Sequence, residues 1–511
     1  MTTPSPDRPG SPSNISIHWI IGLGLGITAT AFAIYGMLSR FVFNPDPFIY
    51  AQAIKQLFAG ERLYAGAWQD RPPLGLLFYA PPQILAPRSY LAMELFLAGW
   101  LVVEGFLFAW LARRRPWVAL GVYAFVVLCP ATYWDFFWPS TEHAANLFVA
   151  LLLLAAFVVT RDNRSDWRIA VLTGAATTMA FHARQSALLF CLVPLVALAR
   201  ARQSWRDRAA IVGMTVGAGV ATWALLVVSL APFTDLAGYW HITFRYPFLF
   251  AQQDMNQTRW QLTEPILMTP LCVLGTFFFT LAVSGRHRLL AITATAAGLI
   301  ATLASPRAHT HYWAQMLPVI ALLILLANER NRRWDRKITV ACLAAMGVAA
   351  VAGVSQFLDT AFNASEGGLF REVAGALDRA AQPGDTVFVL GPMPSDYILF
   401  ASAVPPAHRF YCPWQLNRPR ADLLPEPLEQ IFRDYATHPP SLLVVERHYL
   451  EAIQKLPIQL PQEIQLIQML VTRYAYRVLL DDVRGFVLLR RVGTRRTPSA
   501  TELAPRVAPA R

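Results

Sequence analysis

Long apolar segments alternate with short polar ones along the first two-thirds of the chain. A helix of about 20 apolar residues crosses the hydrocarbon core of a bilayer. The pattern therefore predicts a polytopic α-helical membrane protein with about eleven spans. Their approximate bounds are 17–38, 91–112, 117–130, 144–160, two short spans within 169–198, 209–230, 264–283, 289–303, 313–327 and 338–354.

Two features set the predicted topology. The short spans within 169–198 are divided at His182 to Gln185, and a re-entrant hairpin there would leave the topology unchanged. Arginine clusters fall on alternate loops, which places those loops in the cytoplasm by the positive-inside rule. We expect a multi-pass protein of the inner (plasma) membrane with a cytoplasmic N-terminus. The predicted outer loops are 39–90, 133–143, 182–185, 232–263 and 305–311.

The pattern changes after about residue 356, where apolar runs become shorter and charges more frequent. It predicts helices at 370–381 and 428–435, strands at 386–390 and 442–445, and a hairpin of 476–480 with 486–489. We expect a small extracytoplasmic α/β domain over 357–493. The remaining predicted parts are a disordered cytoplasmic segment (1–15), a transmembrane domain (16–356) whose first external loop spans 39–90, and a disordered tail (494–511).

Composition narrows the function. The chain is 55% hydrophobic and 15% charged, with a mean hydropathy of +0.38. Its net charge of +12 comes from arginine clusters between spans, so no nucleic-acid partner is indicated. The five cysteines form no CxxC pair, and no GxGxxG or GxxxxGK[ST] motif occurs. We therefore expect no zinc site, no disulfide framework and no nucleotide cofactor.

The predicted outer loops collect the polar side chains that could carry chemistry. They hold Asp46, Asp70 and Arg71 in the first loop, then Asp135, Glu142, His182, Arg184, Arg307 and His311. A carboxylate can deprotonate a hydroxyl nucleophile, and arginine can neutralise a phosphate. Structural interpretations stand beside these. Asp46 before Pro47 could cap a helix, Asp70 and Arg71 could be a surface pair, and Asp135 could anchor an aromatic belt.

Four short motifs resemble the bacterial integral-membrane glycosyltransferases of the GT-C fold, which include protein-mannosyltransferase-like and lipid A aminoarabinose-transferase-like enzymes. The motifs are DPFIY (46–50), QDRPPL (69–74), TEHAAN (141–146) and AHTHYW followed by MLP (308–318). Their order and their common predicted face carry the resemblance, and the predicted topology agrees with it over about residues 16–356.

The resemblance implies transfer of a sugar from a polyprenyl-phosphate carrier to an acceptor hydroxyl by a single inverting displacement. Asp46 would be the general base. Asp135 or Glu142 would position the acceptor or a divalent ion, Mg or Mn. Candidates for the donor phosphate are Arg71, Arg184 and Arg307, and candidates for support are Tyr50, Asp70, His182 and His311. The family often has two adjacent acidic residues where Asp46 stands between two prolines, which weakens a metal role there.

Other functions remain open. The acceptor could be a lipid, a polysaccharide or a protein, and membrane lipids surround any such enzyme. A transporter or flippase of lipid-linked sugars would also be polytopic, but it would favour internal repeats, and the sequence displays none. A third alternative is an assembly protein that presents its outer domain to a partner.

Overall fold

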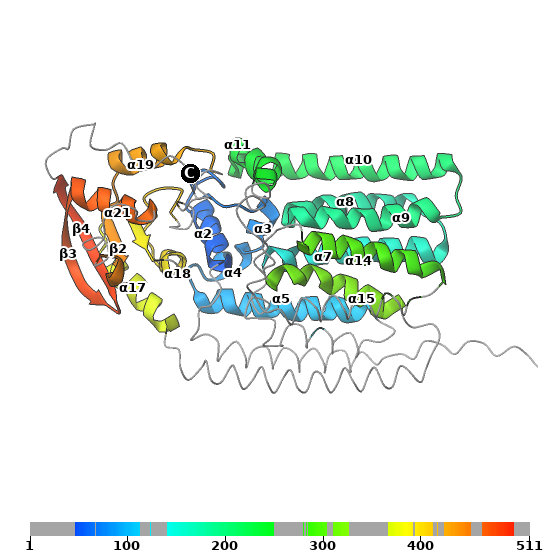
Figure 1. Ribbon diagram of the computed structural model, residues 1–511, viewed down its shortest axis with the longest axis horizontal. Coiled ribbons are helices and arrows are strands. Elements are labelled where there is room, and N and C mark those ends of the chain that lie inside the picture. The colour runs from blue at the N-terminus through cyan, green and yellow to red at the C-terminus, as the bar shows by residue number, and fades with distance from the viewer. Residues whose placement is uncertain are drawn as a thin grey trace, which may run out of the picture.

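The computed structural model describes residues 46–66, 68–112, 123, 140–249, 280, 283, 285–303, 310–326, 366–391, 394–411, 416, 424–450 and 462–494. A bundle of long helices occupies one end of the molecule and a small sheet with its helices the other (Figure 1). Short helices of the predicted first loop, among them α2 (Asp46–Phe58), lie between these two parts (Figure 1).

The bundle consists of helices joined by tight connections. Its described members are α5 (Tyr90–Leu111), α7 (Thr141–Asp162), α8 (Trp167–Ala183), α9 (Leu192–Arg200), α10 (Trp205–Leu230), α14 (Arg288–Leu303) and α15 (Leu317–Leu326). Helix α8 packs against both α7 and α10. Gly174 makes the second contact possible, because a Cβ there would lie 2.1 Å from the carbonyl oxygen of Thr215.

Three of the described helices are long and apolar enough to cross a membrane: Tyr90–Leu111, Thr141–Asp162 and Trp205–Phe233. Helix α10 leaves large apolar side chains exposed along its length, including Val216, Leu225 and Val228. Apolar surface of this extent is unfavourable in water and stable in lipid. The prediction of a membrane-embedded helical bundle is therefore supported, while the number of eleven spans stays a prediction.

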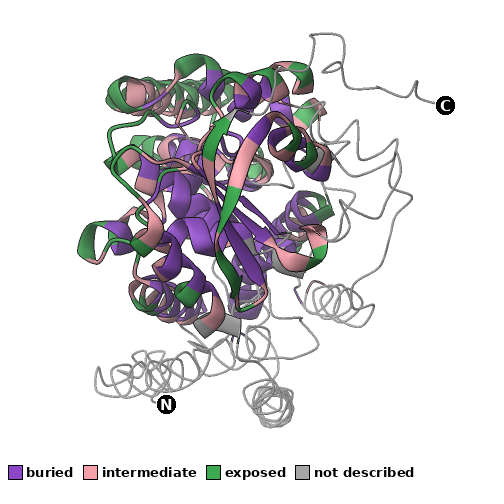
Figure 2. Cartoon of the chain, turned by 90° about the vertical axis from the view of Figure 1, so that its left-hand side faces the viewer, coloured by how far each residue is buried: buried purple, intermediate pink, exposed green. Residues whose placement is uncertain are grey.

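The sheet at the other end has four strands in the order β1-β2-β4-β3. Strands β1 (Val387–Leu390) and β2 (Leu442–Glu446) are parallel, and β4 (Phe486–Thr494) is antiparallel to both β2 and β3 (Tyr474–Val483). The apolar runs of β1 and β2 are buried, whereas the edge strand β3 is largely exposed (Figure 2). Helices α17 (Glu366–Ala380), α18 (Pro394–Ala401), α19 (Leu428–Thr437) and α21 (Gln462–Arg473) accompany the sheet.

Most elements expected from the sequence lie where the pattern placed them. The break at His182 to Gln185 separates α8 from the 3-10 helix η3 (Gln185–Cys191). Strands β1 and β2 and the hairpin β3–β4 match their expected positions, while α18 and α21 had not been expected. Predictions for 1–45, for the spans at 117–130 and 338–354, for most of the span at 264–283 and for the tail beyond 494 fall outside the described residues.

Candidate active site

The first part of the site is the beginning of helix α2. Asp46 is its first residue and Pro47 its second, a position where proline, which has no N–H, does not interrupt the hydrogen-bond pattern of the helix. One turn later the hydroxyl of Tyr50 donates to Oδ2 of Asp46 at 3.3 Å. Tyr50 is buried and Asp46 is half-buried. Packing thus fixes the helix that carries this carboxylate, which itself remains partly accessible.

Arg71 lies beside this pair. Its guanidinium is 3.0 Å from Asp70 and lies 5.5 Å from the centre of the Tyr50 ring. The hydroxyl of Tyr64 donates to the backbone carbonyl of Arg71 at 2.8 Å. Burial opposes protonation of Arg71, but Asp70, Tyr50 and Asp46 outweigh it and raise its pKa well above the usual value. Arg71 therefore stays positively charged close to the Asp46 carboxylate.

The second part joins the start of α7 to the end of α8. Glu142 is fully buried, and its Oε1 is 2.9 Å from the guanidinium of Arg184. Its Oε2 accepts hydrogen bonds from the hydroxyls of Ser140 (2.6 Å) and Thr141 (3.2 Å). The Arg184 guanidinium also lies 4.8 Å from the centre of the Tyr312 ring. A buried carboxylate is thus matched by one cation and two hydroxyl donors, as a charge in a bundle requires.

The two parts meet around Tyr79, a buried residue whose ring lies 5.6 Å from that of Tyr50. Burial raises the pKa of Tyr79 first, and the negative charges of Asp46 and Glu142 raise it further, while Arg71 and Arg184 oppose them. All four charged groups therefore act on one phenol. The four charged residues of the site span 138 positions in the sequence (184 minus 46).

Gly75 is what allows the approach of the two parts. It lies in helix α3 (Pro73–Leu77), directly after the Asp70-Arg71-Pro72 segment. A Cβ at this position would lie 2.7 Å from the carbonyl oxygen of Ala183 and 2.9 Å from Cγ2 of Thr141. Both contacts are too short for carbon, so a side chain here would push the Arg71 segment away from Glu142 and Arg184.

His182 lies elsewhere, between α8, α10 and α11 (Leu236–Trp240). Its Nδ1 is 2.8 Å from the carbonyl oxygen of Thr178, which can only accept, so Nδ1 carries the proton. Its Nε2 then accepts from the hydroxyl of Tyr239 at 2.9 Å, and that oxygen accepts from the indole of Trp223. Both ring nitrogens are used, which indicates that this histidine joins helices.

Three other candidates cannot be compared with this geometry. Asp135 and Arg307 lie outside the described residues, and so does the side chain of His311, whose backbone belongs to the 3-10 helix η7 (Thr310–Met316). The sequence did not single out Tyr79, Ser140 or Tyr312 as parts of the site. A tyrosine or serine near an apolar run is too common a signal, and only the fold shows what it contacts.

A second buried polar group lies deeper in the bundle. Glu104 of α5 accepts from Asn146 at 2.5 Å and from Tyr123 at 3.1 Å, and its Oε2 is 2.6 Å from Nδ1 of His143. All four side chains are buried. Glu104 is thus a hydrogen-bonding partner inside the bundle. These contacts hold α5 against α7 at His143, the residue that follows Glu142.

The part containing the sheet is attached to α2 and the loop after it. Phe48 packs against Tyr397 and Phe400 with ring centres 4.7 and 5.1 Å apart. Gln69 donates to the hydroxyl of Tyr411 at 2.8 Å, and the backbone N–H of Trp68 donates to the carbonyl of Arg409 at 3.0 Å. Helix α2 and the Trp68-Gln69 segment, which flank the candidate site, are thus held by contacts with the sheet-bearing part.

Lys55 makes the most pH-sensitive of these attachments. Its amine donates to the carbonyls of Leu399 and Ser402, each at 2.5 Å. Burial lowers the pKa of Lys55 to about 7; Arg88 lowers it as well, and Asp378 opposes both. The unfolded chain keeps the ordinary, higher pKa, so between pH 7 and that value the unfolded state binds more protons and stability rises with pH.

We therefore expect wild-type protein to gain thermal stability, relative to a Lys55→Met variant, as the pH rises from 7 to about 9. Unfolding midpoints of the two purified proteins in detergent at several pH values would measure this. A constant difference between them across the range would show that Lys55 is not buried as described.

The contacts of the buried carboxylates limit which of them could bind a metal ion. The carboxylate of Glu142 is already held by Arg184 and two hydroxyls, an arrangement that fits an ion pair and not a metal ligand. In the described part of the chain, one group could hold an ion: His408, Glu426 and Asp434, with ligand atoms within 4.8 Å of one another. Arg409 pairs with Glu426, and the N–H of Phe410 donates to His408 Nδ1, which leaves the proton on Nε2, the nitrogen nearest Asp434.

Comparison with solved structures identifies the fold. ArnT from Cupriavidus metallidurans bound to undecaprenyl phosphate aligns with a TM-score of 0.56 and 13% sequence identity, covering 93% of this chain and 98% of that one. The same protein in the apo state gives 0.55 and 15%, covering 92% and 98%. No protein-family model and no curated sequence matches the chain. The predicted GT-C resemblance is confirmed as a shared fold.

Proposed function

We propose that this membrane protein is a glycosyltransferase that moves a sugar from a polyprenyl-phosphate carrier to an acceptor hydroxyl on the outer face of the membrane. The observation that supports this best is a half-buried carboxylate, Asp46, held beside the permanently charged Arg71 at the end of a bundle with the fold of ArnT. That solved relative carries undecaprenyl phosphate, which makes a lipid-linked donor the natural candidate here.

The reaction is a single displacement with inversion. The acceptor oxygen attacks the anomeric carbon of the sugar as Asp46 takes the hydroxyl proton. The bond from the anomeric carbon to the phosphate oxygen breaks, and the polyprenyl phosphate leaves with the electron pair. Arg71 stabilises the negative charge that develops on the phosphate. Tyr50 holds the Asp46 carboxylate, and Asp70 orients the Arg71 guanidinium.

Arg307 keeps its proposed role at the donor phosphate, Asp135 its proposed role in positioning the acceptor or a divalent ion, and His311 its proposed supporting role. Arg184 is already paired with Glu142, so we assign this pair to shaping the floor of the site. The sheet-bearing part, 366–494, would lie outside the membrane on the same face, because it contacts the loop that carries Asp46 and Arg71. We assign the whole protein to the inner membrane of the cell.

Reconstitution into vesicles separates this function from transport. Vesicles containing envelope lipid extract as the source of donor and acceptor would be incubated with purified protein and analysed by mass spectrometry. We expect a new glycosidic product and a free polyprenyl phosphate. Movement of labelled lipid-linked sugar across the bilayer without any glycosidic product would favour the flippase alternative and refute ours.

A further inference from the structure

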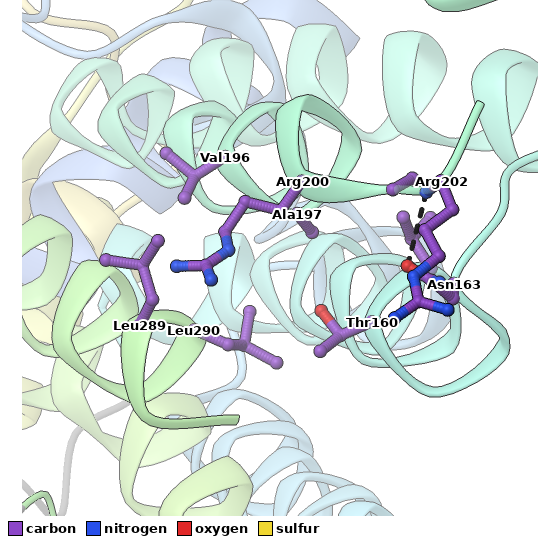
Figure 3. A pocket seen from close by; sticks show the side chains of 10 residues that line it. Thr160, Asn163, Val196, Ala197, Arg200, Arg202, Leu289 and Leu290 are labelled. Atoms are coloured by element: carbon purple, nitrogen blue, oxygen red, sulfur yellow. Dashed lines mark hydrogen bonds between the residues drawn. The ribbon is translucent and has the colours of Figure 1, made fainter. Parts of the chain in front are cut away.

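A pocket of about 360 Å³ opens at the other end of the bundle, where α7 and α9 end and α14 begins (Figure 3). Helix α7 carries Glu142 in its first turn and Thr160 of the pocket in its last. At 1.5 Å per residue, its 22 residues place the pocket about 30 Å from the candidate active site. The pocket is therefore separate from the chemistry proposed above.

The wall of the pocket is apolar and its rim is basic. The side chain of Arg200 points toward Val196, Leu289 and Leu290 on one side, while that of Arg202 lies at the other side beside Asn163 (Figure 3). Because α7 and α10 are long enough to span a bilayer, this end of the bundle belongs at a boundary between lipid and water. An amphipathic pocket at that depth fits a molecule with a charged head and an apolar body.

The rim is a built structure that fixes Arg202. The backbone N–H of Arg202 lies within hydrogen-bond distance of both the side-chain and the backbone oxygen of Asn163, at 3.2 and 3.1 Å. Asn163 ends α7 in the left-handed conformation (φ 57°), which asparagine tolerates. One residue on, Gln203 exchanges two hydrogen bonds with the backbone of Ser165. The two loops are thereby joined.

Among the residues that the structure describes, none neutralises the positive charge of Arg200 and Arg202. Within the described chain, the guanidinium groups of Arg200 and Arg202 make no hydrogen bond or ion pair. The adjacent carboxylate, Asp162, is held by Arg161 through contacts of 2.7 and 3.0 Å. The segments 161–168 and 200–208 together contain seven arginines and three aspartates. The pocket thus has two cations available for an anion.

We propose that this pocket binds an anionic glycerophospholipid, with Arg200 on the phosphate, Arg202 adding positive charge at the rim, and the apolar residues against the glycerol and the first acyl carbons. Guanidinium groups suit phosphate because they can donate two parallel hydrogen bonds to it. Basic pockets between spanning helices are a recurrent way to hold such head groups. Inorganic phosphate shares the anionic chemistry, but it would leave the apolar wall unused.

The test compares full-length wild type with Arg200→Gln/Arg202→Gln and with Arg206→Gln as a matched control. Arg206 lies in the first turn of α10, over the ring of Trp205, and it does not line the pocket. Each purified protein is titrated with short-chain phosphatidylglycerol, short-chain phosphatidylcholine or inorganic phosphate, and binding is followed by native mass spectrometry and by the unfolding midpoint.

We expect phosphatidylglycerol to bind wild type and the control, and to bind the double variant about 30-fold more weakly, since each cation near the head group contributes on the order of 1 kcal/mol. Equal binding of phosphatidylcholine, equal binding by the double variant, or an equal response to inorganic phosphate would overturn the proposal. If the double variant cannot be purified, Arg200→Gln alone gives the same comparison. None of these results depends on sugar transfer.

Discussion

Asp46→Asn is expected to lower the rate of sugar transfer by about 10²- to 10⁴-fold, the usual contribution of a positioned general base. Asparagine keeps the shape of the side chain and can still accept the hydrogen bond from Tyr50, so the amount of folded protein should not change. The measurement is the initial rate of product formation in membranes adjusted to equal protein content.

A matched control is Asp166→Asn, which changes an aspartate in the same way at the opposite end of the bundle, where it caps α8. Its transfer rate should equal that of wild type, because asparagine is as good a helix cap as aspartate. An Asp46→Asn protein that transfers sugar at the wild-type rate would remove Asp46 from the role of base.

Arg184→Met is expected to destabilise the protein by about 3–5 kcal/mol, because it leaves the carboxylate of Glu142 buried without its cation. The hydroxyls of Ser140 and Thr141 remain, but they cannot balance a charge. Urea unfolding of the purified protein in detergent measures the loss. The double variant Arg184→Met/Glu142→Leu should regain most of it, since a buried ion pair replaced by apolar groups is often neutral in stability.

The double variant also separates two roles of Arg184. If its role is to pair with Glu142, a folded double variant keeps much of its affinity for the donor. If Arg184 binds the donor phosphate as well, the double variant folds but needs a much higher donor concentration. A single variant as stable as wild type would contradict the buried pair itself.

The helices and strands could be predicted from the sequence more completely than the contacts within the candidate site. The length of the apolar runs predicted α5, α7 and α10. In lipid the backbone N–H and C=O groups must pair within the segment, and a single segment can do this only as a helix. The strands β1 and β2 were equally clear as short apolar runs. The sequence pattern did not predict helix α18. This helix has only eight residues, and its apolar residues do not recur at helical spacing.

The site was predicted in part. Asp46, Tyr50, Asp70 and Arg71 are close in sequence, so their association needed little tertiary information. Glu142 and Arg184 were both singled out, yet their direct pairing depends on how α7 meets α8 and on the absence of a side chain at Gly75. Long-range contacts of this kind leave no periodic signal in one sequence.

The central claim is that the protein adds a sugar to an envelope component by means of Asp46. Mass spectrometry of the glycans and lipids of a strain lacking the protein, complemented with wild type or with Asp46→Asn, tests it most directly. We predict one species in the deleted strain that is lighter by a single sugar unit, restored by wild type and not by Asp46→Asn. Unchanged glycans and lipids in the deleted strain, or full restoration by Asp46→Asn, would contradict the claim.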